Sequence, residues 1–111
     1  MSQNDAIEES LGSVFTLTDQ IAYQPDSIVS RTILDTSSTT VTLFAVDSGQ
    51  RISEHSAPHE ALLQVLDGEA TVTVGQTDHV LGSGDSVLLP AEEPHALAGH
   101  RSFKMLLVMA R

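Results

Sequence analysis

The sequence predicts an all-β protein, and three observations support this fold class. Short segments rich in Val, Ile, Leu and Thr recur along the chain, turns containing Gly or Pro separate them, and only one segment has a helical pattern. Many short strands with regular turns are typical of a β-sandwich or a small β-barrel. The 111 residues correspond in length to one domain.

Apolar content and the alternation of apolar with polar residues predict where the strands lie. In residues 69–74, Ala70, Val72 and Val74 share one face, which is the two-residue period of a half-buried strand. Asp67-Gly68 separates two apolar segments and predicts a tight hairpin, because glycine adopts positive φ without steric cost. The segment that carries His55 is also taken as a strand. The other expected strands are 27–34, 40–46, 61–66, 69–74, 79–81, 86–90, 95–98 and 103–109.

The N-terminal segment is the exception to the β pattern. Residues 5–12 are the helix candidate, with Ile7 and Leu11 four residues apart and Gly12 as a stop, and one or two helical turns or an irregular segment are both compatible with this pattern. The first ten residues are polar and acidic, so we do not expect a signal peptide. No apolar segment approaches the roughly 20 residues of a membrane span. We therefore expect a cytoplasmic protein.

Composition excludes several classes of function. The formal charge of −10 results from 15 acidic and 5 basic residues, whereas nucleic acids and anionic membranes are bound by Lys/Arg patches. The chain has no cysteine, which excludes disulfides, thiolate metal sites and cysteine nucleophiles. Ser53 and Ser56 lie near histidines, but no carboxylate follows at the spacing of a hydrolytic triad.

Two histidine-containing patterns resemble the motifs of the cupin family. The first pattern starts at Gly49, reaches His55 after five residues and ends at Gly68, as in the family motif G-x5-H-x-H-x(3,4)-E-x6-G. The second starts at Gly84 and continues through a proline to His95, as in G-x5-P-x-G-x2-H-x3-N.

The resemblance covers residues 49–99 and implies a small jelly-roll β-barrel. It implies a single domain, 1–111, in which residues 1–24 form a covering segment and residues 25–111 form the barrel. It also implies that His55 and His95 lie together on one side of the barrel interior.

The departures from the family motifs concern the metal ligands. Metal-binding cupins use three histidines and a glutamate, and two of these positions hold Ala57 and Ala61 in this chain. Only His55 and His95 match the expected ligands, and two imidazoles alone hold a metal weakly. The remaining expectation is a divalent ion, either Zn, Ni, Mn or Fe. Two further motif positions also differ, with Glu92 in place of a glycine and Gly99 in place of an asparagine.

Other polar residues near the motif have two interpretations each. His59 could supply a third nitrogen and Glu60 a carboxylate, or both could be polar residues of a solvated turn after Pro58. Gln64 lies on the face opposite Leu63 and is expected on an outer or subunit-facing surface. His79 and His100 match no motif and are expected at the surface.

The two alanines predict a roomier and more apolar pocket. Its expected lining is Ala57, Ala61, Leu63 and Val65, with Val72, Leu88, Leu97 or Met105 as further candidates. Apolar walls with a few placed polar groups are typical of ligand sites. With no Trp and one Tyr, the chain suits a small aliphatic or carbonyl-bearing ligand better than a nucleoside.

Three functions are compatible with these features. The first is a metal-binding cupin, either a binding protein or a small dioxygenase- or isomerase-like enzyme. The second is a metal-free module that binds or senses a small molecule. The third is a structural or stress-related dimer with a vestigial site.

The strands also predict a homodimer. Residues 61–66 and 103–109 are apolar on both faces, whereas a barrel with one solvated face should alternate. The N-terminal residues Ile7, Leu11, Val14 and Phe15 could cover part of the second face. A two-fold partner could cover the rest by exchanging an edge strand such as 27–34.

Overall fold

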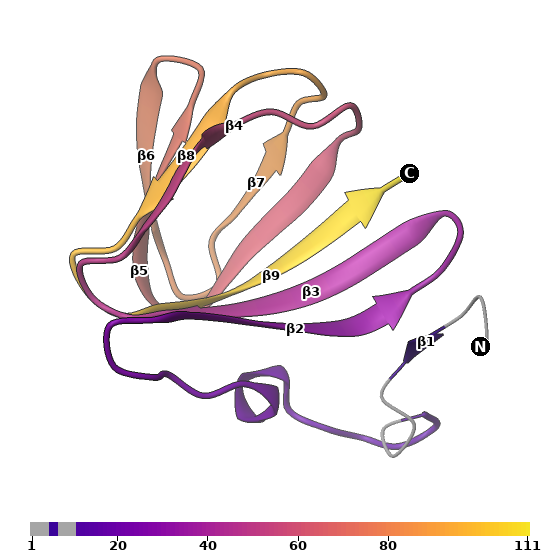
Figure 1. Cartoon of the computed structure of the whole chain (residues 1–111). Helices are drawn as coiled ribbons and strands as arrows, with labels where there is room; N and C mark the ends of the chain where they lie inside the picture. Colours follow the sequence, from indigo (N-terminus) through magenta and orange to yellow (C-terminus); the bar gives the residue numbers. More distant parts are fainter. Residues whose placement is uncertain (1–4, 7–10) are drawn as a thin grey trace.

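Nine β-strands form two curved, facing layers in a computed structural model that describes residues 5–6 and 11–111 (Figure 1). One layer has the order β1-β2-β3-β9-β5 with β7 beyond β5, and the other has the order β4-β8-β5-β6. All pairs are antiparallel, which confirms the all-β jelly-roll prediction. The strands are β1 Asp5–Ala6, β2 Ile28–Asp35, β3 Thr39–Val46, β4 Arg51–His55, β5 Ala61–Val74, β6 Thr77–Gly82, β7 Ser86–Leu89, β8 His95–Ala98 and β9 Phe103–Ala110.

Strand β5 belongs to both layers, and the predicted hairpin at Asp67-Gly68 is wrong. Its first half pairs with β7 and β9, and its second half pairs with β6 and β8. The register shifts between Val65 and Asp67, and Gly68 has a φ of +78°. A Cβ at Gly68 would collide with the carbonyl oxygen of Ser102. Glycine therefore forms a corner where one strand crosses between layers.

The inner faces of the two layers pack against each other as predicted from alternation. Leu63, Val65, Val72 and Phe103 are fully buried there, and Met105 is nearly so. Each such side chain contributes about 1.5–3 kcal/mol by leaving water. The period-2 pattern of the strands is therefore the main determinant of which side chains reach the interior.

A segment before β2 covers part of the outer face of the β2-β3-β9-β5 layer. It contains the short 3-10 helix η2 (Leu17–Gln20), and its residues Leu17, Ile21 and Tyr23 pack against Leu43 and Leu106. We call residues 17–23 the strap. The cover was expected from residues further toward the N-terminus, and this expectation is wrong for the exposed Leu11, Val14 and Phe15; Ile7 lies outside the described residues.

Polar contacts fix the strap to the barrel at both ends. Lys104 Nζ donates to the carbonyl oxygen of Thr18 at 2.7 Å, and Arg31 donates to the carbonyl oxygen of Gln20 at 3.0 Å. The hydroxyl of Tyr23 donates to Asp67 at 2.6 Å. The barrel thus satisfies the carbonyl groups of Thr18 and Gln20, which would be costly to leave unpaired over an apolar face.

The helix expected over residues 5–12 is not supported where the chain is described. Asp5 and Ala6 form β1 and pair with Asp35 and Leu34 of β2, and Gly12 has a φ of +73°. Residues 7–10 lie outside the described part. A helix long and apolar enough to cross a membrane is absent from residues 5–6 and 11–111.

Candidate functional site

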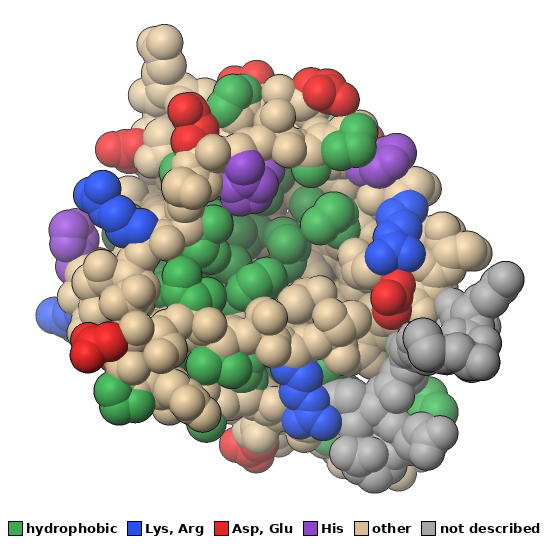
Figure 2. Space-filling model, in the orientation of Figure 1, with side chains coloured by type: hydrophobic (Ala, Val, Ile, Leu, Met, Phe, Trp, Pro, Cys, Tyr) green, Lys and Arg blue, Asp and Glu red, His purple; other side chains and the backbone are tan. Residues whose placement is uncertain are grey.

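A cavity of about 240 Å³ opens between the two layers. Its walls combine apolar side chains from both layers with two imidazoles, and Figure 2 shows a hollow lined with hydrophobic side chains and a histidine beside it. The lining residues are Phe44, Ile52, His55, Leu63, Leu89, His95, Leu97, Met105 and Leu107. The cavity is slightly smaller than the roughly 300–1,000 Å³ of pockets for drug-sized ligands, so it suits a smaller molecule.

Strands β4 and β8 place the two histidines side by side. His55 ends β4, His95 begins β8, and the two residues are register partners. The register shifts between Ile52 and His55, so both of these side chains line the cavity although they are three residues apart. Strict alternation would place them on opposite faces. The irregularity in β4 therefore turns His55 toward the cavity.

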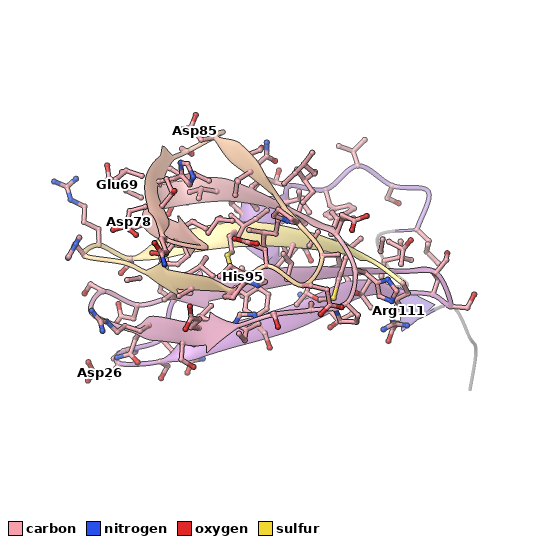
Figure 3. The ribbon with its side chains drawn as sticks, turned by 90° about the horizontal axis from the view of Figure 1, so that it is seen from above. Asp26, Glu69, Asp78, Asp85, His95 and Arg111 are labelled. Carbon is pink, nitrogen blue, oxygen red and sulfur yellow. The ribbon has the colours of Figure 1, made fainter. Side chains whose placement is uncertain are left out.

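The two imidazoles meet through their Nε2 atoms, which lie 3.0 Å apart. The ring centroids are 4.2 Å apart with an angle of 69° between the ring planes. His95 is 7% exposed, and it lies near the middle of the molecule in Figure 3, whereas His55 is exposed at the rim. The polar end of the cavity is therefore a pair consisting of one buried and one accessible imidazole.

The contact made by Nδ1 of each ring indicates which ring nitrogen carries the hydrogen. His55 Nδ1 lies 2.9 Å from the carbonyl oxygen of Ser53, and His95 Nδ1 lies 3.2 Å from that of Glu93. A carbonyl oxygen only accepts hydrogen bonds, so each Nδ1 carries the hydrogen. In neutral rings of this tautomer both Nε2 atoms present a lone pair, and a separation of 3.0 Å is the distance at which a proton or another cation is shared between two such atoms.

Burial lowers the pKa of His95. Desolvation of the ring is the largest cause, the carbonyl group of Glu93 opposes it, and the charge of His55 adds to the lowering. Lowering the pKa favours the neutral imidazole, which is the form that donates a lone pair to a metal. Two Nε2 lone pairs at 3.0 Å repel each other unless a cation or a hydrogen-bond donor interacts with them.

The donor chemistry fits a metal held by two nitrogens. Two imidazole nitrogens bound to one ion at about 2.0–2.1 Å and near a right angle lie about 3.0 Å apart. Among residues 5–6 and 11–111, no group of three or more His, Cys, Asp or Glu is placed to hold a metal. An ion at this end of the cavity would therefore have two imidazole ligands among the described residues, which is compatible with weak binding only.

The structure separates His59 and Glu60 from the histidine pair. Both residues are exposed on the loop between β4 and β5, and they form no three-residue group with His55 and His95. The solvated-turn interpretation describes this geometry better than the third-ligand interpretation. Gln64 is half-buried outside the cavity lining, with its amide nitrogen 3.5 Å from the carbonyl oxygen of Gly84. His79 and His100 are exposed.

The pocket lining expected from the sequence is placed only in part. Leu63 lines the cavity, as do Leu97 and Met105 from the wider set of candidates. Val65 and Val72 are buried in the core and Leu88 is 71% exposed. Ala57 is half-buried on the loop after β4, and Ala61 is buried in the core cluster, at the edge of a shallow depression that Leu62 and Val108 also line.

Four lining residues were not found by sequence reasoning: Phe44, Ile52, Leu89 and Leu107. Leu107 alternates with Met105 along β9, so a strict two-residue count would have included it. In β7 Leu88 was expected in the cavity lining, but the neighbouring Leu89 is the buried residue and Leu88 is exposed. Phe44 and Ile52 come from strands whose inner faces were not assigned.

Two loops lie next to the histidine pair. Residues 56–60 follow His55 and residues 90–94 precede His95, and the amide of Glu92 donates to the carbonyl oxygen of Ala57 at 2.7 Å. Glu92 has a φ of +66°, which is uncommon for a residue other than glycine. The family pattern has a glycine at this position. The backbone bond to Ala57 compensates for the strain and joins the two loops.

Comparison with known proteins supports the fold resemblance. The family model described as "Cupin domain" matches residues 42–109. A conserved protein of unknown function from Streptococcus pyogenes has 34% identity and a TM-score of 0.89, and the alignment covers 100% of this chain and 96% of that one. A cupin 2 conserved barrel domain protein from Leptotrichia buccalis has 35% identity and a TM-score of 0.84 over 87% of this chain and 47% of that chain. A cupin superfamily protein from Desulfitobacterium hafniense DCB-2 has 28% identity and a TM-score of 0.82, with coverage of 85% and 86%. No curated protein matches the chain.

Proposed function

Because this chain belongs to the cupin domain family, we propose that it is a small-molecule-binding protein whose cavity also holds a divalent metal ion weakly. The ligands of the ion are His55 and His95. The observation that carries the proposal is the 3.0 Å separation of two Nε2 atoms whose rings each place Nδ1 within hydrogen-bond distance of a backbone carbonyl oxygen. When bound, the ion supplies a Lewis acid at the polar end of an apolar cavity. We assign no reaction to the site.

Metal titration of untagged protein tests this proposal. Calorimetry with Zn²⁺, Ni²⁺, Mn²⁺ and Fe²⁺ after treatment with a chelator should give binding of one ion with modest affinity. His55→Ala and His95→Ala should each abolish it. His59→Ala is the matched control, since His59 is exposed on the adjacent loop, and it should leave the affinity unchanged. Absence of uptake at millimolar metal, or equal losses in all three variants, would contradict the proposal.

Metal-free binding of a small molecule is the second candidate function. Seven of the nine lining residues are apolar, and the described residues contain no third metal ligand. A protein that binds no ion but still binds a small molecule in a manner dependent on Leu63 and Leu97 would support this alternative.

A homodimer is a further part of the proposal. Leu62 and Leu88 are 37% and 71% exposed, and they lie beside the half-buried Val108 around a shallow outer depression that the strap does not cover. Two residues of β2, Leu34 and Asp35, pair with β1. Along the rest of its length, β2 pairs with β3 alone among the described strands. Light scattering at micromolar concentration should give twice the chain mass of 11.8 kDa. A monomer at that concentration would contradict this part.

We also propose that residues 1–24 and 25–111 are the cover and barrel of one domain. The strap and its polar contacts to the barrel support this division. The cytoplasmic location stays a prediction from the sequence.

A further inference from the structure

The polar end of the cavity is built from hydrogen-bond acceptors. Each Nδ1 lies within hydrogen-bond distance of a backbone carbonyl oxygen, which favours the Nδ1–H tautomer, and in this tautomer the Nε2 atoms of His55 and His95 offer lone pairs to the cavity. His55 and His95 are the only polar side chains in the cavity lining. An organic ligand can therefore satisfy this end only with a group that donates N–H or O–H hydrogen bonds.

No basic residue lines the cavity to receive an acid. Lys104 and Arg31 bind carbonyl groups of the strap, and Arg111 pairs with Asp35 at 3.0 Å. Arg51 lines a neighbouring groove that shares Ile52 and Leu97 with the cavity, and both Arg51 and Arg101 are exposed outside the cavity lining. These residues are all five cations of the chain. An ionised carboxylate would thus face the two Nε2 lone pairs with no cation in the lining, whereas an ammonium group can donate hydrogen bonds to both nitrogens.

The negative charge of the chain favours a cation instead. Glu54, Glu92 and Glu93 each lie within three residues of His55 or His95 in the sequence, and all three are exposed outside the cavity lining. The chain as a whole has a formal charge of −10. Such a field raises the local concentration of cations and lowers that of anions.

The apolar walls exclude polyhydroxylated ligands. The seven lining residues besides the histidines are Leu, Ile, Phe or Met and offer no side-chain hydrogen-bond partner. A sugar would leave its hydroxyl groups unpaired on binding, which carries a desolvation cost. A volume of about 240 Å³ accommodates roughly eight water-sized groups at about 30 Å³ each. The body of the ligand is therefore a short hydrocarbon.

We propose that the cavity binds a small primary amine, with its ammonium group at the Nε2 atoms of His55 and His95 and its hydrocarbon chain against Leu63, Leu97 and Met105. This inference rests on the proposed function, in which the cavity is the binding site. The ammonium group and a metal ion compete for the same lone pairs.

Calorimetry with four small probes tests the class of ligand. Chelator-treated, full-length protein is titrated at neutral pH with hexylamine, hexanol, hexanoate and ethanolamine, because the amines are then protonated and the acid is ionised. Hexylamine should bind at least ten-fold more tightly than hexanoate, with hexanol between them. Ethanolamine, which has the ammonium group without the chain, should not bind.

Variants locate the binding. His55→Ala removes one acceptor at the exposed rim and should weaken hexylamine binding at least five-fold. His59→Ala and His79→Ala are controls at exposed histidines and should leave it unchanged. Leu97→Asn places an amide in the apolar wall and should weaken hexylamine binding. Circular dichroism confirms that each variant is folded before it is titrated.

The outcomes separate this inference from the proposed function. Hexanoate binding as tightly as hexylamine, with loss in His55→Ala, overturns the amine class and leaves the cavity as the binding site. Histidine-dependent uptake of Ni²⁺ without binding of any probe also overturns the amine class. Hexylamine binding that is unchanged in His55→Ala shows that the amine binds elsewhere and overturns the inference.

Discussion

The outer face under the strap and the inner face around the cavity are both apolar surfaces of the same strands, but only one of them is filled. On β9, Leu106 faces the strap, whereas Met105 and Leu107 face the cavity. The strap closes the outer face with apolar contacts and with hydrogen bonds from Lys104 and Arg31. The inner face keeps a hollow that ends at two imidazoles. The strap therefore buries apolar surface on the outer face, whereas the inner face retains an apolar hollow at the candidate site.

The largest expected effect on stability comes from removing apolar contacts between the strap and the outer face. Ile21 is 6% exposed and packs in the cluster with Leu43 and Ala45. Ile21→Ala should lower the free energy of unfolding by about 2–4 kcal/mol, because it removes buried methyl groups from a packed cluster. Urea denaturation measures this loss. Val14→Ala, at a fully exposed position, is the control and should stay within about 0.5 kcal/mol of wild type.

The hydrogen bond between Tyr23 and Asp67 should give a smaller and pH-dependent effect. Burial of the phenol, the hydrogen bond to Asp67 and the negative charge of Asp67 raise the pKa of Tyr23. A raised pKa in the folded state means that this stabilisation is present below pH ~10 and is lost as pH rises toward the folded-state pKa.

Two measurements check the Tyr23 prediction. Tyr23 is the only tyrosine, so absorbance at alkaline pH follows its titration alone. The midpoint should lie above ~10 in the folded protein. Tyr23→Phe should cost about 1 kcal/mol at neutral pH and should flatten the alkaline loss of stability. A midpoint at or below that of the unfolded chain would show that the strap is not fixed by this bond.

His95, at the cavity, should make stability decrease at acidic pH, whereas Tyr23 makes it decrease at alkaline pH. Its pKa is lowered in the folded state, mainly by burial. The corresponding stability is therefore present above pH ~6.5 and is lost as pH falls through the folded-state pKa. Chelator-treated wild type should lose stability on acidification more steeply than His95→Leu, as measured by urea denaturation at several pH values. Equal slopes for the two proteins would contradict the burial argument.

The smallest effect on stability is expected for His55. Its side chain is exposed at the cavity rim, so His55→Ala should change the free energy of unfolding by no more than about 0.5 kcal/mol. The same variant should lose metal binding. A large loss of stability in metal-free protein would show that the histidine pair is a structural contact and not a binding site.

Much of this architecture could be predicted from the sequence because alternation determines which side chains are buried. The faces of β9 follow directly from the order of Met105, Leu106 and Leu107. The motif spacing also predicted that His55 and His95 would meet. Both predictions rest on regular features, namely strand period and residue spacing within the family motifs.

The remainder depended on irregular features that leave no clear pattern. Asp67-Gly68 fits a tight turn as well as a strand corner, and pairing with four other strands decides between them. The bend in β4 that turns His55 inward has no glycine or proline to mark it. Leu17 and Ile21 lie in an irregular segment, so neither a strand nor a helix period identified the strap.

The tautomers of the two imidazoles test the central claim most directly. Long-range ¹H–¹⁵N correlation spectra of chelator-treated protein at neutral pH report which nitrogen of each ring carries the hydrogen. We predict Nδ1–H for both His55 and His95, with both Nε2 atoms unprotonated and available to a cation or a donor. A hydrogen on Nε2 of either ring in the neutral form would contradict the proposed site, because the cavity would then end in a donor rather than in two acceptors.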